Sequence, residues 1–191
     1  MRLIIVDGLD GVGKDTHAQL ILNRYKQKGE TVIIRSHPAS DNFYGKTAKK
    51  ALLGKGKIDR LKASVFYALD VLRSIRLYYR KPKHDTLIMV RYLMGIAYLP
   101  KVSGRVAYKV FEKLVPTSKY MFFLDASPDI LLKRITRRNK KEMFETYGAL
   151  VRVRGKALDL AGGWYIFDTA QPIEKTYAKI EVVLDMLDEK Q

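Results

Sequence analysis

The segment Gly8–Thr16 constrains the fold of this chain more than any other. It reads GLDGVGKDT and matches the phosphate-loop pattern G-x-x-x-x-G-K through Lys14. An apolar run at Arg2–Val6 precedes it, and apolar residues spaced three and four apart follow it from Ala18 to Tyr25. Glycines allow successive N–H groups to point at phosphate oxygens, and the helix N-terminus adds partial positive charge. The order strand, loop, helix therefore predicts a nucleotide triphosphate site.

Within this loop, Lys14 is placed to reach the β- and γ-phosphates. The hydroxyl residue expected directly after the lysine is replaced by Asp15, and Thr16 comes next. We predict ATP bound with Mg²⁺, which Thr16, Asp15 or Asp7 would hold. The alternative for Asp15 is a first-turn acid stabilised by the helix dipole. The predicted ATP-binding residues are Gly8, Asp10, Gly11, Val12, Gly13, Lys14, Asp15 and Thr16.

Four more apolar runs resemble the first in length and in their β-branched and aromatic residues. None alternates with polar residues, which is typical of strands buried on both faces of a parallel sheet. Helical stripes separate the runs, and Pro128 and Pro172 indicate two helix starts, the first capped by Ser127. We predict an α/β fold: a doubly wound, five-stranded parallel sheet with helices on both faces, forming one domain over residues 1–191. The predicted strands are Arg2–Val6, Thr31–Arg35, Thr86–Val90, Lys119–Leu124 and Trp164–Phe167.

Composition excludes several other classes of protein. With 191 residues, 47% of them hydrophobic, the chain can bury a sizeable core. The absence of cysteine excludes disulfides, a thiol nucleophile and thiolate zinc sites, and three scattered histidines argue against a histidine metal cluster. No apolar run approaches the roughly 18 residues that a membrane span needs. We expect a soluble, cytoplasmic protein with no membrane contact.

The net charge of +16 is concentrated in two segments. Residues 44–83 contain 12 basic and 2 acidic residues, and residues 133–156 contain 9 basic and 2 acidic residues. One interpretation is that these are solvated helix faces. The other is that they form two basic walls around a phosphate-rich ligand.

Six parts of the chain share residue types and order with one known family. They are Asp7–Lys14 (DGLDGVGK), Arg35–Pro38 (RSHP), Tyr67–Asp70 (YALD), Arg91–Tyr92 with Ala97–Tyr98, Leu124–Asp129 running to Arg134–Ile135, and Phe144–Glu145 with Val153–Gly155. Together they resemble the thymidylate kinase family of P-loop nucleoside monophosphate kinases. The resemblance implies ATP- and Mg²⁺-dependent phosphoryl transfer to thymidylate or a related deoxynucleotide, and by analogy a homodimer.

The resemblance also implies an acceptor-binding region at about residues 36–98. There Tyr67 would stack on the acceptor base, Asp10 would receive a sugar hydroxyl, and Arg91 would bind the acceptor phosphate. The acceptor-binding residues that it implies are Asp10, Pro38, Tyr67, Asp70, Arg73, Arg91 and Tyr98.

Departures from the family pattern cluster in this acceptor region. Val90 stands where the family has an acid at the end of the third strand, and Val71 stands where it has an arginine, for which Arg73 or Arg76 could substitute. Met94, Gly95 and Ile96 replace a polar group that would bind the thymine edge. Because a site without its hydrogen-bonding groups discriminates poorly, the acceptor base stays open.

A basic lid is expected at about residues 134–146, where Arg134, Arg137, Arg138, Lys140 and Lys141 are crowded together. Phosphoryl transfer depends on cationic stabilisation of the transferring group. Some relatives carry an arginine at the position of Gly11, so here the lid would supply it. The alternative is an exposed basic helix end stabilised by its own dipole. The predicted catalytic residues are Lys14, Arg91, Arg137 and Arg138.

A second hypothesis comes from a different class of protein. Because Val90 removes an acid that the kinase chemistry normally uses, the chain could be a catalytically weak ATP-binding module. Its basic segments would then bind nucleic acid, with an affinity that falls steeply as salt rises.

Overall fold

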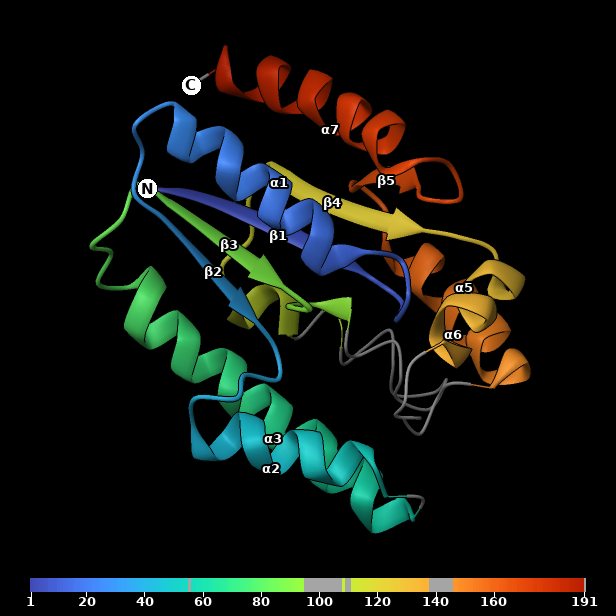
Figure 1. The fold of residues 1–191 in the computed structure, drawn as a ribbon. Coiled ribbons are helices and arrows are strands. Elements are labelled where there is room, and N and C mark those ends of the chain that lie inside the picture. The colour runs from blue at the N-terminus through green and yellow to red at the C-terminus, as the bar shows by residue number, and fades with distance from the viewer. Residues whose placement is uncertain (55, 95–107, 109–110, 138–145, 191) are drawn as a thin grey trace.

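The computed structural model describes residues 1–54, 56–94, 108, 111–137 and 146–190. In this part of the chain, five parallel strands form one sheet in the order β2-β3-β1-β4-β5 (Figure 1). Each predicted strand is present: β3 has the predicted ends, β1 extends two residues further, and the other three lie one residue later. The strands are β1 Arg2–Gly8, β2 Val32–Ser36, β3 Thr86–Val90, β4 Tyr120–Asp125 and β5 Tyr165–Asp168.

Burial of the central strands confirms that both faces of the sheet are covered. All five residues of β3 are buried, and successive side chains of a strand point to opposite faces. The pairing aligns Val6 of β1 with Val90 of β3, and Gly8 with Leu124 of β4. The carboxyl ends of these three strands therefore lie side by side.

Helices connect the strands in the predicted α/β alternation. In Figure 1, α1 crosses the sheet with α7 beside it, the α2–α3 pair lies on the side of β2, and α5 and α6 lie beyond the carboxyl end of β4. The helices are α1 Lys14–Gln27, α2 Phe43–Leu52, α3 Lys57–Ser74, α5 Pro128–Thr136, α6 Tyr147–Leu160 and α7 Ile173–Asp188, with a π-helical turn at Ile75–Tyr79 after α3. No helix among the described residues is long and apolar enough to cross a membrane.

The predicted stripe of α1 packs as expected, since Ala18, Ile21 and Tyr25 are fully buried. The predicted start of α5 at Pro128 is confirmed, but the predicted cap of α5 and the predicted start of α7 need correction. Ser127 occupies the N-cap of α5, but its side chain makes no capping hydrogen bond. Pro172 is itself the N-cap of α7, because its ψ of 147° is extended and the helix begins one residue later.

Candidate functional site

Backbone conformation explains the glycines of the loop between β1 and α1. The φ angles of Gly8, Gly11 and Gly13 are 141°, 88° and 89°, all in the region that side chains disfavour. At Gly8 a Cβ atom would lie only 2.2 Å from the carbonyl oxygen of Leu124. The loop can therefore pass close to the end of β4 only because this position has no side chain.

Lys14 is held inside that loop and is 2% exposed. Its Nζ donates to the carbonyl oxygens of Gly8 at 2.7 Å and Leu9 at 2.6 Å, and it lies 3.6 Å from Oδ1 of Asp10. Burial lowers the pKa of Lys14 to about 8, and the nearby Arg91 cation contributes to this lowering. The ammonium is thus fixed in place at the start of α1.

Arg91, the residue after β3, contacts both this loop and the first turn of α1. Its Nη1 and Nη2 lie 3.1 Å and 3.0 Å from the two carboxylate oxygens of Asp15, and Nη1 also donates to Oγ of Ser36 at 3.0 Å. Its Nε lies 3.6 Å from Oδ1 of Asp10. Partial loss of water around Asp15, which is otherwise exposed, would by itself raise its pKa, but the hydrogen bonds and charge of Arg91 outweigh this effect and lower that pKa.

The three residues predicted to hold magnesium have different surroundings. Asp7 is 1% exposed, and its carboxylate accepts four backbone N–H groups. Asp15 and Thr16 are exposed in the first turn of α1. The accessible oxygen atoms of this set are therefore those of Asp15 and Thr16, while Asp7 is bound to the backbone.

Tyr67 of α3 lies beside the backbone of Arg91. Its hydroxyl donates to the carbonyl oxygen of Arg91, and its ring meets His37 edge-on with centroids 6.5 Å apart. Pro38, which follows His37, is half-buried. Tyr67, Pro38 and Arg91 therefore border the same region, at the carboxyl ends of β2 and β3.

Asp70 and Arg73 occupy two further positions on α3. Asp70 is fully buried and accepts the N–H of Ala39 and the amide of Asn42, both at 2.7 Å. It therefore holds the chain between β2 and α2. Arg73 is half-buried, and its Nη1 has no hydrogen-bond partner among the described residues.

The described part of the lid places two arginines differently. Arg134 donates through Nη2 to the carbonyl oxygen of Thr169 at 2.7 Å and through Nη1 to that of Gly11 at 3.3 Å. Arg137 is exposed at the C-terminal end of α5. Two predicted site residues, Arg138 and Tyr98, lie outside the described residues.

Ser36 also contacts Asp15 and Arg91, and sequence reasoning missed it. Its Oγ donates to Oδ1 of Asp15 at 3.1 Å and accepts from Arg91. It is the last residue of β2, and in open parallel sheets ligands bind beyond the carboxyl ends of the strands. That rule, applied to the end of every predicted strand, would have found it.

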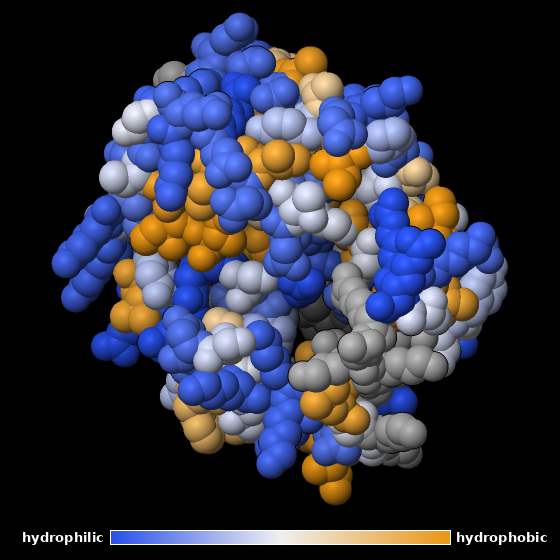
Figure 2. Space-filling model, viewed as in Figure 1, coloured by the Kyte–Doolittle hydropathy of each residue, from blue (hydrophilic) through white to orange (hydrophobic). Residues whose placement is uncertain are grey.

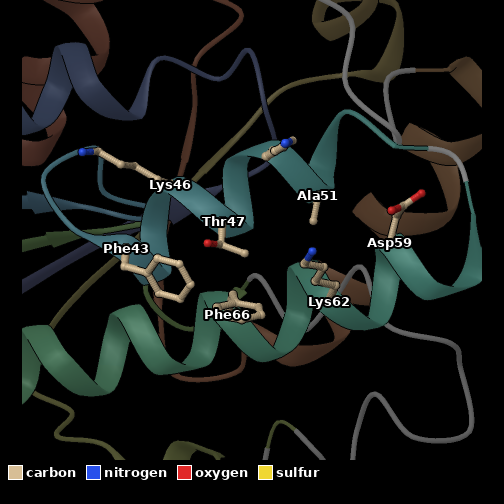
Figure 3. A pocket seen from close by; sticks show the side chains of 8 residues that line it. Phe43, Lys46, Thr47, Ala51, Asp59, Lys62 and Phe66 are labelled. Carbon is tan, nitrogen blue, oxygen red and sulfur yellow. The ribbon is translucent and has the colours of Figure 1, made fainter.

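A surface pocket of about 480 Å³ lies between α2 and α3 (Figure 3). It is separate from the contacts that Lys14 and Arg91 make. Phe43 of α2 and Phe66 of α3 pack edge-to-face beside each other in its lining, with ring centroids 5.8 Å apart. It is lined by Phe43, Lys46, Thr47, Lys50, Ala51, Asp59, Lys62 and Phe66. No predicted ATP- or acceptor-binding residue is among them.

Comparison with known proteins agrees with this architecture. The family model described as thymidylate kinase matches residues 6–180. The chain belongs to the thymidylate kinase family. It is 27% identical to a probable thymidylate kinase of Archaeoglobus fulgidus, over 96% of this chain and 94% of that protein. It is 26% identical to a putative thymidylate kinase of Aeropyrum pernix, over 81% of this chain and 76% of that one.

A solved thymidylate kinase structure from Candida albicans shares the fold of this family member. The TM-score is 0.78 at 16% identity, and the match covers 100% of this chain and 93% of that one. The predicted P-loop kinase fold and the family resemblance are confirmed. The roles of the individual site residues stay predictions.

Proposed function

We propose that this chain transfers the γ-phosphoryl group of ATP to a nucleoside monophosphate, with thymidylate or a related deoxynucleotide as the acceptor. An oxygen of the acceptor phosphate forms a bond to the γ-phosphorus of ATP. The bond between that phosphorus and the β–γ bridging oxygen breaks, and ADP leaves with its electron pair. Such a reaction needs positioning and positive charge more than covalent help from the protein.

One observation carries this proposal: a buried cation, Lys14, and a half-buried one, Arg91, converge on one carboxylate oxygen. Nζ of Lys14 and Nε of Arg91 each lie 3.6 Å from Oδ1 of Asp10. Lys14 comes from the phosphate loop, and Arg91 comes from the end of the neighbouring strand β3. A phosphate donor on the loop and an anionic acceptor beside β3 would therefore each meet a cation.

The other residues would divide the work as follows. Lys14 would stabilise the β- and γ-phosphates, and Arg91 would orient the acceptor phosphate. Arg137, and Arg138 beyond the described residues, would stabilise the transferring group. Tyr67 would border the acceptor base. Arg73, whose Nη1 is buried and has no hydrogen-bond partner among the described residues, would contribute positive charge to the acceptor site.

Asp15 and Thr16 are the residues proposed to hold Mg²⁺, directly or through water. Their oxygen atoms suit this ion, which is usually bound by one or two protein oxygens together with substrate phosphates and water. When bound, Mg²⁺ neutralises charge that develops on the phosphates. Since Asp15 pairs with Arg91, ion binding at Asp15 would also affect the acceptor arginine.

A nucleotide panel tests the proposal directly. Purified protein with ATP and Mg²⁺ is incubated with each ribo- and deoxynucleoside monophosphate, and ADP formation is followed. We expect turnover with at least one pyrimidine deoxynucleotide, and the panel would identify the base. If no monophosphate is phosphorylated, the proposed function is wrong.

A homodimer is proposed as the functional form, with α3 as the contact. Its outward face carries five apolar side chains spaced three or four residues apart: Ile58, Leu61, Val65, Leu69 and Leu72, which are 38% to 82% exposed. A second copy could cover them, because an apolar stripe of this length is costly to leave in water. Sedimentation should give twice the chain mass, and Leu61→Lys should give monomers. A monomeric wild-type protein at tens of micromolar would rule the dimer out.

Nucleic-acid binding through the basic segments is the competing hypothesis, and the cytoplasmic location likewise stays a prediction. If phosphate contacts drive such binding, log affinity should fall with log salt by about 0.9 for each contact. Titration with duplex and single-stranded oligonucleotides between 50 and 200 mM salt measures this slope. The kinase proposal expects little or no binding.

A further inference from the structure

Three consecutive backbone N–H groups after β3 converge on one oxygen of Asp7. The nitrogens of Tyr92, Leu93 and Met94 lie 2.8, 2.9 and 2.9 Å from its Oδ2. The other oxygen, Oδ1, accepts the N–H of Gly8 at 3.0 Å. Because Asp7 is 1% exposed, these backbone groups take the place of water around its charge.

Arg91, immediately before this segment, has a backbone conformation that is rare outside glycine. Its φ is 55°, in the left-handed region, which is unfavourable for a residue with a side chain. Its N–H donates to the carbonyl oxygen of Val6 at 3.3 Å, and its own carbonyl oxygen accepts the hydroxyl of Tyr67. Contacts on both sides of Arg91 therefore hold this strained turn.

We propose that Asp7 is the positioning residue that fixes Arg91 against the phosphate loop. Successive N–H groups curled around an anion form the kind of concavity in which proteins bind phosphate. Here the anion is a carboxylate of the same chain, and binding it sets the path of residues 92–94 and hence the turn at Arg91. The inference rests on the proposed function, because Arg91 is the residue proposed to orient the acceptor phosphate.

The end of β3 carries no carboxylate of its own, because its last residue is Val90. Val90 ends β3, is fully buried and pairs with Val6. Asp7 is the next residue of β1. The negative charge beside the turn is therefore supplied from β1, one residue further along, while the end of β3 itself is apolar.

A purely structural role is the competing explanation, since a satisfied buried carboxylate also stabilises a core. The location of Asp7 favours the positioning role. Asp7 directly precedes Gly8, whose carbonyl oxygen accepts from Lys14 at 2.7 Å, and the segment that it binds directly follows Arg91. One carboxylate thus joins the strand of the donor site to the turn of the acceptor site.

The variant Asp7→Asn keeps the size of the side chain but puts an amide NH₂ group in place of one oxygen. The NH₂ group of the asparagine would then face backbone N–H groups, so that two hydrogen-bond donors oppose each other. We expect hydrogen exchange at the amides of residues 92–94 to become at least about tenfold faster. The KM for the acceptor should rise at least about tenfold, while the Kd for ATP changes less than about threefold.

Two further variants separate positioning from stability. Asp7→Glu keeps the carboxylate and should restore most of the acceptor KM. Asp85→Asn is the matched control, because Asp85 accepts the N–H and hydroxyl of Thr31 at 2.8 and 2.7 Å, at the opposite end of the sheet. It weakens a carboxylate contact with one backbone N–H at an exposed position, far from Arg91, and should leave both KM values unchanged.

The proposal is overturned if Asp7→Asn leaves the exchange of residues 92–94 unchanged, or if its kinetics match those of Asp85→Asn. Should the wild-type protein phosphorylate no monophosphate, the proposed function fails separately. The NMR signal of the Arg91 Nε–H group then decides the role of Asp7. A signal shifted in Asp7→Asn but not in Asp85→Asn supports positioning, and an unshifted signal refutes it.

Discussion

The phosphate-loop side of the molecule and the α2–α3 side both carry positive charge, but they hold it differently. Lys14 is 2% exposed, and it and Arg91 contact carbonyl, carboxylate and hydroxyl oxygens at fixed distances. Lys46, Lys50 and Lys62 instead line an open pocket floored by two phenylalanines (Figure 3). Figure 2 likewise shows hydrophilic side chains over much of the visible surface, with apolar patches between them.

This difference indicates where the excess charge can matter. A cation fixed by neighbouring oxygens is preorganised and acts strongly on a bound phosphate, because little reorganisation is needed. A solvated lysine loses side-chain entropy when it binds and is screened by salt. The chemistry should therefore depend more on Lys14 and Arg91 than on Lys46, Lys50 and Lys62 of the α2–α3 pocket.

The largest expected effect comes from Lys14→Met, which removes the ammonium but keeps the length of the side chain. We expect kcat to fall at least about 100-fold, as when one preorganised transition-state donor is lost. The melting temperature should not fall, because an expensive buried charge is removed. Lys46→Met, in the α2–α3 pocket, is the control. An equal loss of kcat in that variant would show that the two sides of the molecule do not differ in their contribution to catalysis.

Arg91→Lys retains the charge but loses the planar fork that meets both oxygens of Asp15. We expect kcat/KM for the acceptor to fall about 10- to 100-fold in steady-state assays. Arg24→Lys, at the far end of α1, alters an arginine that bonds one oxygen of Asp185, and it should be nearly neutral. Equal effects of the two variants would contradict a special role for Arg91.

ATP affinity should depend on pH through Lys14, whose pKa burial lowers to about 8. The ammonium is present below that pH and is lost above it. The affinity for ATP should therefore be highest below pH about 8 and should fall by up to tenfold per pH unit above it. A fluorescent ATP analogue titrated from pH 7 to 9.5 measures this. In Arg91→Gln the decline should move to higher pH, because a neighbouring cation is gone; an unmoved decline would point to another group.

The smallest effect is expected from replacing Lys46, Lys50 and Lys62 together with serine. Exposed substitutions usually change stability by less than about 0.5 kcal/mol. We expect kcat/KM within about twofold of wild type and an unchanged melting temperature. A tenfold loss of kcat/KM would show that the open basic side belongs to the reaction, and the contrast between the two sides would have to be abandoned.

The fold was predictable because its signals are local. Apolar runs without alternation indicated β3 and its neighbours, and the glycines of the loop reflected a backbone that a Cβ at Gly8 would block. Helix starts were less predictable. Whether Ser127 caps α5 depends on a single side-chain contact that propensity cannot show.

The site could be predicted only in part, because sequence signals are local and the site joins segments that are distant in the chain. The sequence by itself determined the strand, loop and helix around Lys14, because these residues are adjacent in the chain. Only the tertiary structure decided that Asp15, Ser36 and Arg91 meet, although 76 positions separate Asp15 from Arg91. It also decided that Asp7 binds the backbone that follows Arg91. The strand order β2-β3-β1 brings the carboxyl ends of three distant segments together, and no spacing along the chain encodes that meeting.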